Sequence, residues 1–198
     1  MQALARFTLR VLGWSLEGRR PDAKRNVLLA APHTSNWDLP FMLAAAYAFG
    51  IRPSWLGKRE LFRRPFGGFM RWLGGIPIDR SRSGNFVAEA VERFTQGEPL
   101  TMVIPPSGTR SRAPYWKSGF YQIARGARVP VVCSALDYRR RVATIGPALA
   151  LSGDVGRDMD AIRSFYEGVS GKYPERTTPV RLVEEDREPT GKAAAGGA

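Results

Sequence analysis

Short apolar runs alternate with longer amphipathic or apolar segments along almost the whole chain. A short apolar run between turn residues predicts a strand, and a longer segment with apolar residues three or four positions apart predicts a helix. The predicted strands are residues 27–31, 54–57, 76–78, 100–104, 129–136 and 142–145. The predicted helices are residues 3–16, 39–49, 66–73, 86–96, 118–125 and 159–172. This alternation predicts a single α/β domain with a mixed, mostly parallel central sheet flanked by helices.

The chain shows neither an internal repeat nor a shift in composition that would mark a second domain. Its 198 residues are enough for one domain with a substantial core. We expect this domain to span residues 1–188 and the tail 189–198, which is rich in Gly and Ala, to be disordered. No apolar run reaches the roughly 18 residues of a membrane-spanning helix, so none is expected.

The first predicted helix has an apolar stripe formed by Leu4, Phe7 and Val11, and two arginines lie off that stripe. Such a pattern is typical of a helix that lies in a membrane interface, which makes residues 1–17 a candidate membrane-contact segment. A helix that packs against the core has the same pattern, so both interpretations stay open here. Because the arginines interrupt the apolar stretch, the segment lacks the form of a signal peptide.

Basic residues outnumber acidic ones: 30 Lys and Arg against 18 Asp and Glu give a formal net charge of +12. A field of this sign favours polyanions, whether nucleic acid, anionic lipid headgroups or phosphorylated small molecules. Arginine outnumbers lysine, which suits bidentate contacts with phosphate. Genome composition produces the same excess of arginine, so charge alone does not choose a partner.

Cys133 is the only cysteine, and it lies within the apolar run 129–136. An intrachain disulfide is therefore excluded, and we expect a buried thiol in a protein of a reducing compartment. A zinc site needs several cysteine or histidine ligands, and this chain has one of each. We expect neither a metal nor a cofactor.

The only histidine, His33, precedes Asp38 by five positions and directly follows a predicted strand. Neutral imidazole suits the removal of a proton from a hydroxyl near pH 7, and a carboxylate can hold its tautomer. Along one helix, five positions would separate the two side chains by about 140°. We therefore expect His33 in the loop and Asp38 in the first turn of the next helix, reaching back. A structural loop histidine beside a helix aspartate would show the same pattern.

Three further stretches place cations and turn residues after predicted strands. Lys58 opens a basic stretch that runs to residue 68, and Arg80 follows the strand 76–78. Residues 104–111 join a Pro/Gly turn to hydroxyl groups and Arg110. Backbone amides and an arginine in such a turn can hold a phosphate, although solvated loops and ordinary turns explain each stretch nearly as well.

In this order, the four stretches resemble the blocks of the glycerolipid acyltransferase family (PlsC-like, 1-acylglycerol-3-phosphate acyltransferase). The H-x4-D block is residues 33–38, and the second block is residues 58–80, with a G-x-I-x-I-D-R-like ending. The P-E-G-T-R-S block is residues 106–111, and the V-P-V run is residues 129–131. The resemblance covers roughly residues 27–145 and is strongest to a short bacterial branch with H-T-S-N-W-D and W-K-x-G-F segments.

The resemblance implies an α/β glycerolipid acyltransferase-like fold and an O-acyltransferase reaction. A fatty acyl group would move from an acyl-CoA or acyl-carrier-protein thioester to a hydroxyl of a lysophosphatidate-like acceptor. His33 would be the general base, oriented by Asp38. Binding of the acceptor phosphate would fall to Lys58, Arg80, Ser107, Gly108, Thr109 and Arg110. Ser107 departs from the family, which usually has glutamate there, and this leaves the acceptor's identity open.

The resemblance also implies peripheral contact with an anionic membrane, at the cytoplasmic, inner face of the cell membrane. No specific nucleic-acid partner is expected, because no nucleic-acid-binding motif is present. Aromatic and methionine side chains that could line an acyl groove, or could equally be core, are Phe41, Met42, Trp55, Phe66, Phe69, Met70 and Trp72.

Two other functions compete with acyl transfer. A hydrolase would use Ser107 or Ser111 as its nucleophile, but the G-x-S-x-G elbow is absent, since Pro105 stands two positions before Ser107. A non-catalytic basic module would bind anionic membrane or nucleic acid, and the net charge favours it.

Overall fold

The computed structural model describes residues 1–78 and 83–186, with the side chains of all of these except 56, 58, 78 and 83–85. Arg80 and the tail 189–198 therefore lie outside the described residues.

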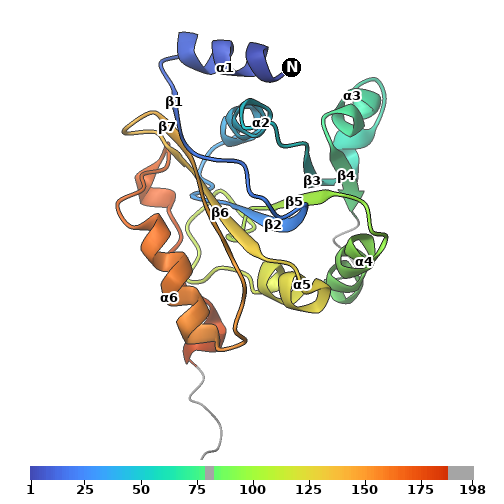
Figure 1. Cartoon of the computed structure of the whole chain (residues 1–198), viewed down its shortest axis with the longest axis vertical. Coiled ribbons are helices and arrows are strands. Elements are labelled where there is room, and N and C mark those ends of the chain that lie inside the picture. The colour runs from blue at the N-terminus through green and yellow to red at the C-terminus, as the bar shows by residue number, and fades with distance from the viewer. Residues whose placement is uncertain (79–82, 187–198) are drawn as a thin grey trace, which may run out of the picture.

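The described strands form one seven-stranded sheet with the order β1-β7-β6-β2-β5-β3-β4 (Figure 1). All neighbouring pairs are parallel except β6 and β7, which are antiparallel. The predicted α/β fold with a mixed, mostly parallel sheet is confirmed. The strands are β1 Ser15–Gly18, β2 Arg25–Ala30, β3 Pro53–Lys58, β4 Gly75–Ile78, β5 Leu100–Ile104, β6 Val131–Asp137 and β7 Val142–Leu149.

Helices cover both faces of the sheet. Helix α2 lies on one face with α1 stacked over it, and α4, α5 and α6 cover the other (Figure 1). The α-helices are α1 Gln2–Val11, α2 Asp38–Ala48, α3 Gly67–Trp72, α4 Ser83–Thr95, α5 Gly119–Ala127 and α6 Val155–Tyr166. Short 3-10 turns are η1 Arg59–Phe62, η2 Pro174–Arg176 and η3 Val183–Asp186.

Alternate residues of β2 enter different cores, as a strand covered on both faces requires. Val27 and Leu29 belong to the core beneath α5 and α6, whereas Leu28 belongs to the core with Leu43 of α2. Cys133, on β6, is 1 % exposed, as the sequence predicted. The strand that leads into the His33 loop is therefore held from both sides.

The first helix ends earlier than predicted, because Gly13 adopts a left-handed conformation with φ of 76°. The N–H of Trp14 donates to Leu9 O at 2.8 Å, and the N–H of Gly13 donates to Arg10 O at 3.0 Å. These two bonds form a Schellman cap, which ends a helix and turns the chain away. The chain continues as β1, a strand that was not predicted, and β1 pairs with β7.

The last predicted helix, 159–172, is displaced toward the N-terminus. It begins four residues earlier, where the Asp154 carboxylate accepts a bond of 3.1 Å from the N–H of Arg157. Aspartate is a favoured N-cap residue because its side chain satisfies one of the free amide groups at the helix start. The helix ends at Tyr166, and the segment that follows is free to return to the His33 loop.

The apolar stripe of α1 points away from the domain. Leu4, Phe7 and Val11 are 69 %, 65 % and 68 % exposed. The helix is attached through buried Leu9 and through side-chain bonds to the carbonyl of Ala48, at the end of α2. The stripe therefore does not pack on the part of the core that the structure describes. None of the helices among residues 1–78 and 83–186 is long and apolar enough to cross a bilayer.

Candidate active site

The chemistry-bearing loops meet at the carboxyl edge of the sheet. Strand β2 lies between β6 and β5 and is parallel to both. The segments that follow these three strands therefore leave the sheet at the same edge, which is where open α/β sheets place their sites. His33 lies in the segment after β2, residues 105–111 follow β5, and Tyr138 follows β6.

His33 lies in the loop after β2, and Asp38 is the first residue of α2, as predicted. The imidazole Nδ1 lies 3.0 Å from Oδ2 of Asp38. The His33 side chain is 22 % exposed and the Asp38 side chain 7 %, so a substrate can reach the ring while its partner stays shielded.

Both oxygens of the Asp38 carboxylate accept hydrogen bonds. Oδ2 accepts from the backbone N–H groups of Thr34 and Ser35, at 2.8 and 2.9 Å, as well as facing His33. Oδ1 accepts from the hydroxyl of Tyr138 at 2.9 Å. The carboxylate thus closes the loop from residue 33 to residue 38 into a compact turn.

These bonds decide the charge of Asp38. Burial raises the pKa of the carboxyl group, but the bonds from His33, Ser35, Tyr138 and Thr34 outweigh burial and leave the pKa below its ordinary value of 3.8. Asp38 is therefore ionised at neutral pH and can only accept. A neutral His33 must then carry its proton on Nδ1, and its Nε2 is free to accept a proton.

Tyr138 was not predicted as a site residue. It directly follows β6, and β6 lies beside β2 in the sheet. The signal in the sequence is a polar residue after the apolar run 129–136. Strand order, which the sequence does not reveal, is what brings Tyr138 to Asp38.

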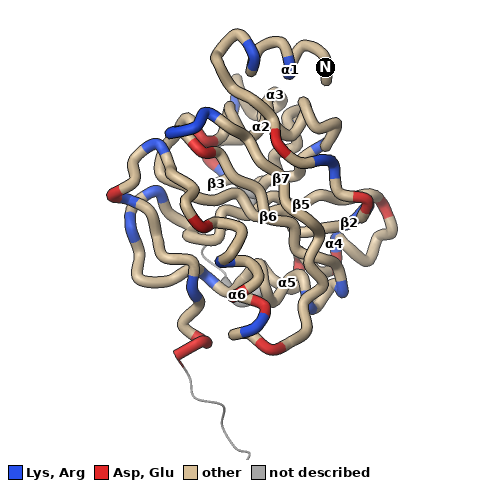
Figure 2. Tube along the Cα trace, turned by 60° about the vertical axis from the view of Figure 1, so that its left-hand side comes forward, with Lys and Arg blue, Asp and Glu red and all other residues tan. Residues whose placement is uncertain are grey.

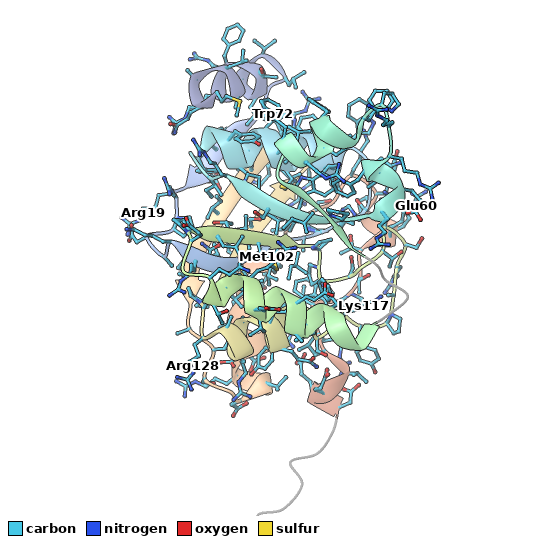
Figure 3. All side chains as sticks on the ribbon, turned by 90° about the vertical axis from the view of Figure 1, so that its right-hand side faces the viewer. Arg19, Glu60, Trp72, Met102, Lys117 and Arg128 are labelled. Carbon is cyan, nitrogen blue, oxygen red and sulfur yellow. The ribbon has the colours of Figure 1, made fainter. Side chains whose placement is uncertain are left out.

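Residues 105–111 form a tight turn after β5. The Ser107 hydroxyl donates to Thr109 O at 2.8 Å, and the N–H of Lys117 donates to Pro106 O at 2.9 Å. Gly108 has φ of 64°, and a Cβ there would lie 3.0 Å from carbons of the Lys117 side chain, which Figure 3 labels. Only glycine suits this position without strain.

The predicted phosphate-binding residues fall into three groups. Gly108, Thr109 and Arg110 line a cavity that His33 and Asp38 also line, so the fold brings these five together. Ser107 is 5 % exposed and does not line that cavity, because its hydroxyl is used inside the turn. Lys58 ends β3 at the same sheet edge, but its side chain, like Arg80, is outside the described part.

The cavity has a volume of about 880 Å³ and extends from His33 into the space between α2 and the sheet. This volume is within the usual range of ligand sites. Most of its inner wall is apolar, including Leu28, Met42, Ala46, Phe49, Trp55 and Val103.

The candidate acyl-groove residues do not share one location. Met42 and Trp55 line the cavity, whereas Phe41 packs on Trp14 with ring centroids 4.8 Å apart. Phe66, Phe69 and Trp72, from the segment around α3, are exposed on the surface. The sequence alone could not separate these roles, because aromatic residues suit all three environments.

Ser111, the second candidate nucleophile of the hydrolase alternative, lines the cavity, whereas Ser107 and the thiol of Cys133 are buried outside it. Burial raises the pKa of the Cys133 thiol to about 12, so its thiolate is scarce at neutral pH. The Ser107 hydroxyl donates to a carbonyl and not to His33. Within residues 1–78 and 83–186, no group of three or more His, Cys, Asp or Glu side chains is placed to hold a metal ion.

Comparison with known proteins adds to this geometry. The sequence profile of a family described as Acyltransferase matches residues 15–137. A 1-acyl-sn-glycerol-3-phosphate acyltransferase of Streptococcus pneumoniae is 29 % identical over 90 % of this chain and 74 % of that protein. One from Haemophilus influenzae is 30 % identical over 63 % of this chain and 56 % of that protein.

Among solved structures, the 1-acyl-sn-glycerophosphate (LPA) acyltransferase PlsC from Thermotoga maritima is similar to this chain. Its TM-score is 0.60 at 18 % sequence identity, and the match covers 85 % of this chain and 76 % of that one. At this identity the likeness shows a shared fold.

Proposed function

This chain belongs to the acyltransferase family, and from that premise we propose that it moves a fatty acyl group from a thioester to a hydroxyl of a lysophosphatidate-like acceptor. The donor would be acyl-CoA or acyl-carrier protein. The observation that carries the proposal is the contact of 3.0 Å between His33 Nδ1 and Asp38 Oδ2 at one end of an apolar cavity.

The proposed reaction needs no nucleophile from the protein. Nε2 of His33 takes the proton of the acceptor hydroxyl while the oxygen attacks the thioester carbonyl carbon. The C–S bond then breaks, and the imidazolium returns the proton to the leaving thiolate. Asp38 holds the ring and stabilises its charged form, as an aspartate does in a Ser-His-Asp triad.

The turn after β5 supports the binding of an anionic acceptor. Gly108, Thr109 and Arg110 line the cavity together with His33. An arginine beside backbone amides suits a phosphate. Binding the phosphate there would hold the acceptor hydroxyl close to His33 before the reaction begins. By resemblance, Lys58 and Arg80 would add to this site. Ser107 would act indirectly, because its hydroxyl shapes the turn.

The apolar wall of the cavity supports the binding of the acyl chain. Each methylene that leaves water contributes about 0.8 kcal/mol, so several carbons would hold the chain firmly. Leu61 lines the cavity and is also 47 % exposed, so the cavity wall continues to the outer surface.

Two exposed apolar surfaces support peripheral binding to an anionic membrane at its cytoplasmic side. The first is the stripe of α1, and the second is the α3 surface, defined as Phe66, Phe69 and Trp72. Both lie at the same end of the molecule (Figures 1 and 3). Figure 2 shows basic residues on α1, and cations beside apolar side chains suit an anionic interface.

The decisive experiment is an acceptor screen with the purified protein and one acyl-thioester. Release of free thiol would be followed with lysophosphatidate, glycerol phosphate, lyso-ornithine lipid and non-phosphorylated alcohols. We expect release with lysophosphatidate, and a loss of about 10²–10⁴-fold in His33→Ala, the range expected for a general base. Equal rates in His33→Ala and the wild type would refute the mechanism.

A further inference from the structure

We propose that Tyr138 is a positioning residue of the His33–Asp38 pair. Its hydroxyl holds the Asp38 carboxylate in the orientation in which Oδ2 faces the imidazole of His33. The expected effect on kcat rests on the proposed function, whereas the positioning of Asp38 rests on the contacts alone. The Tyr138 hydroxyl donates to Oδ1 of Asp38 at 2.9 Å, and Oδ2 of the same carboxylate lies 3.0 Å from His33 Nδ1.

The origin of each bond to Asp38 distinguishes Tyr138 from the other donors. Thr34 and Ser35 belong to the same short loop as His33, so their N–H groups move with it. Tyr138 follows β6 and is 100 residues away in sequence from Asp38. Among the described residues, its hydroxyl is the donor that ties the carboxylate to the sheet. Without it, Oδ1 loses this fixed partner.

The Tyr138 ring is itself held in place. It packs edge-on against Trp14, with ring centroids 5.1 Å apart and an interplanar angle of 88°. It also packs against Phe41 at 6.0 Å and 75°. The backbone N–H of Tyr138 donates to Ser170 O at 2.9 Å. A side chain that packs against two aromatic neighbours and has a hydrogen-bonded backbone can hold its partner in one orientation.

Tyr138 stays a donor at every pH at which the protein would work. Burial, followed by the charge of Asp38 and the bond to it, raises the pKa of Tyr138 well above its ordinary value of 10.0. Lys172 Nζ lies over the Tyr138 ring, 5.9 Å from its centre. The hydroxyl therefore stabilises the negative form of Asp38, the form that an imidazolium needs beside it.

The test compares Tyr138→Phe with Tyr121→Phe. Phenylalanine keeps the ring and its packing, and removes only the hydroxyl. Tyr121 is the control, because it too donates to a carboxylate, Oδ2 of Asp158, at 2.8 Å; it is buried, whereas Tyr138 is half-buried. That pair links α5 to α6 and lies outside the candidate site. Both variants should lose similar amounts of stability in thermal unfolding.

The kinetic readout is the split between kcat and KM. We expect kcat of Tyr138→Phe to fall roughly tenfold, the order expected when a hydrogen bond to a charged group is lost from the transition state. KM for donor and acceptor should change less than about twofold, because Tyr138 contacts neither in this scheme. Tyr121→Phe should keep the wild-type kcat. An unchanged kcat in Tyr138→Phe, or an equal fall in both variants, overturns the proposal.

A second readout does not depend on activity. His33 is the only histidine, so its ring Nδ1–H proton gives one identifiable NMR signal. That signal should move, or vanish through exchange with water, in Tyr138→Phe and should stay at its wild-type position in Tyr121→Phe. A signal that is unaltered in Tyr138→Phe contradicts the structural part. If the wild type lacks acyl transfer but the signal responds, the proposed function fails and the positioning contact survives.

Discussion

The side-chain oxygen of Thr34 accepts a hydrogen bond of 3.2 Å from the backbone N–H of Tyr173, 139 residues later. Next to this bond, a Cβ on Gly171 would lie 2.9 Å from the same oxygen, so the two segments are in close contact. The family match ends at residue 137, yet the segment after α6 returns to the loop that carries His33. The C-terminal part of the domain therefore buttresses the site.

Asp38 should make the stability of the fold depend on acid pH. Its pKa is lowered on folding, so its stabilising contribution is present above the unfolded value of about 3.8 and is lost as pH falls through the folded value. We expect Asp38→Asn to be less stable than the wild type at pH 7, and the gap to narrow below pH 4. Urea unfolding of both proteins at pH 7, 5 and 3 measures this. A gap that is constant across this range contradicts the prediction.

Arg110 should affect the KM for the acceptor and not the KM for the acyl donor. Arg110→Ala removes a cation from the cavity wall, so KM for lysophosphatidate should rise roughly tenfold, as for a lost charge-assisted bond. KM for the acyl-thioester should stay near the wild-type value. Arg19→Ala removes the same charge away from the cavity and is the control. In Figure 3, Arg19 lies on the opposite side of the molecule from Glu60, which lines the cavity. The same rise in Arg19→Ala would show a general electrostatic effect.

Ala46 should limit the length of the acyl chain. This residue of α2 is buried and lines the cavity, so Ala46→Leu adds three carbons to the space the chain would fill. Each methylene that is excluded removes about 0.8 kcal/mol, which is about fourfold in kcat/KM. A series of acyl-thioesters of increasing length measures the effect, which should appear with long chains and not with short ones. Equal losses at every length would mean that the cavity does not hold the chain.

The α1 stripe should contribute to membrane binding. Replacing it in the triple variant Leu4→Ser, Phe7→Ser and Val11→Ser removes three exposed apolar side chains and leaves the contact of Leu9 with the domain intact. In flotation with vesicles that contain anionic lipid, we expect most of the bound fraction to be lost. Val183→Ser, at an exposed apolar residue of η3, should float like the wild type. Full binding by the triple variant would exclude the stripe as a contact.

Local patterns accounted for the element order and for the first part of the site. His33 and Asp38 are five positions apart at a strand-to-helix junction, so the geometry of that junction already brings their side chains together. The turn at Gly108 is equally local. The predicted helix 3–16 was too long, because Gly13 ends α1 and the chain then enters β1, whose first two residues, Ser15 and Leu16, lie in the predicted range.

The contacts that complete the site join residues far apart in the sequence, so they depend on how the elements pack. Tyr138 reaches Asp38 because β6 lies beside β2, and Tyr173 reaches Thr34 because the chain turns back after α6. Neither strand order nor the path of a returning segment is written in the periodicity of any one element, since both depend on how faces from distant elements pack together. Local sequence patterns were enough to single out His33 and Asp38 as the proposed catalytic pair. Packing between distant elements determined which residues hold His33 and Asp38 in place and which residues line the cavity with them.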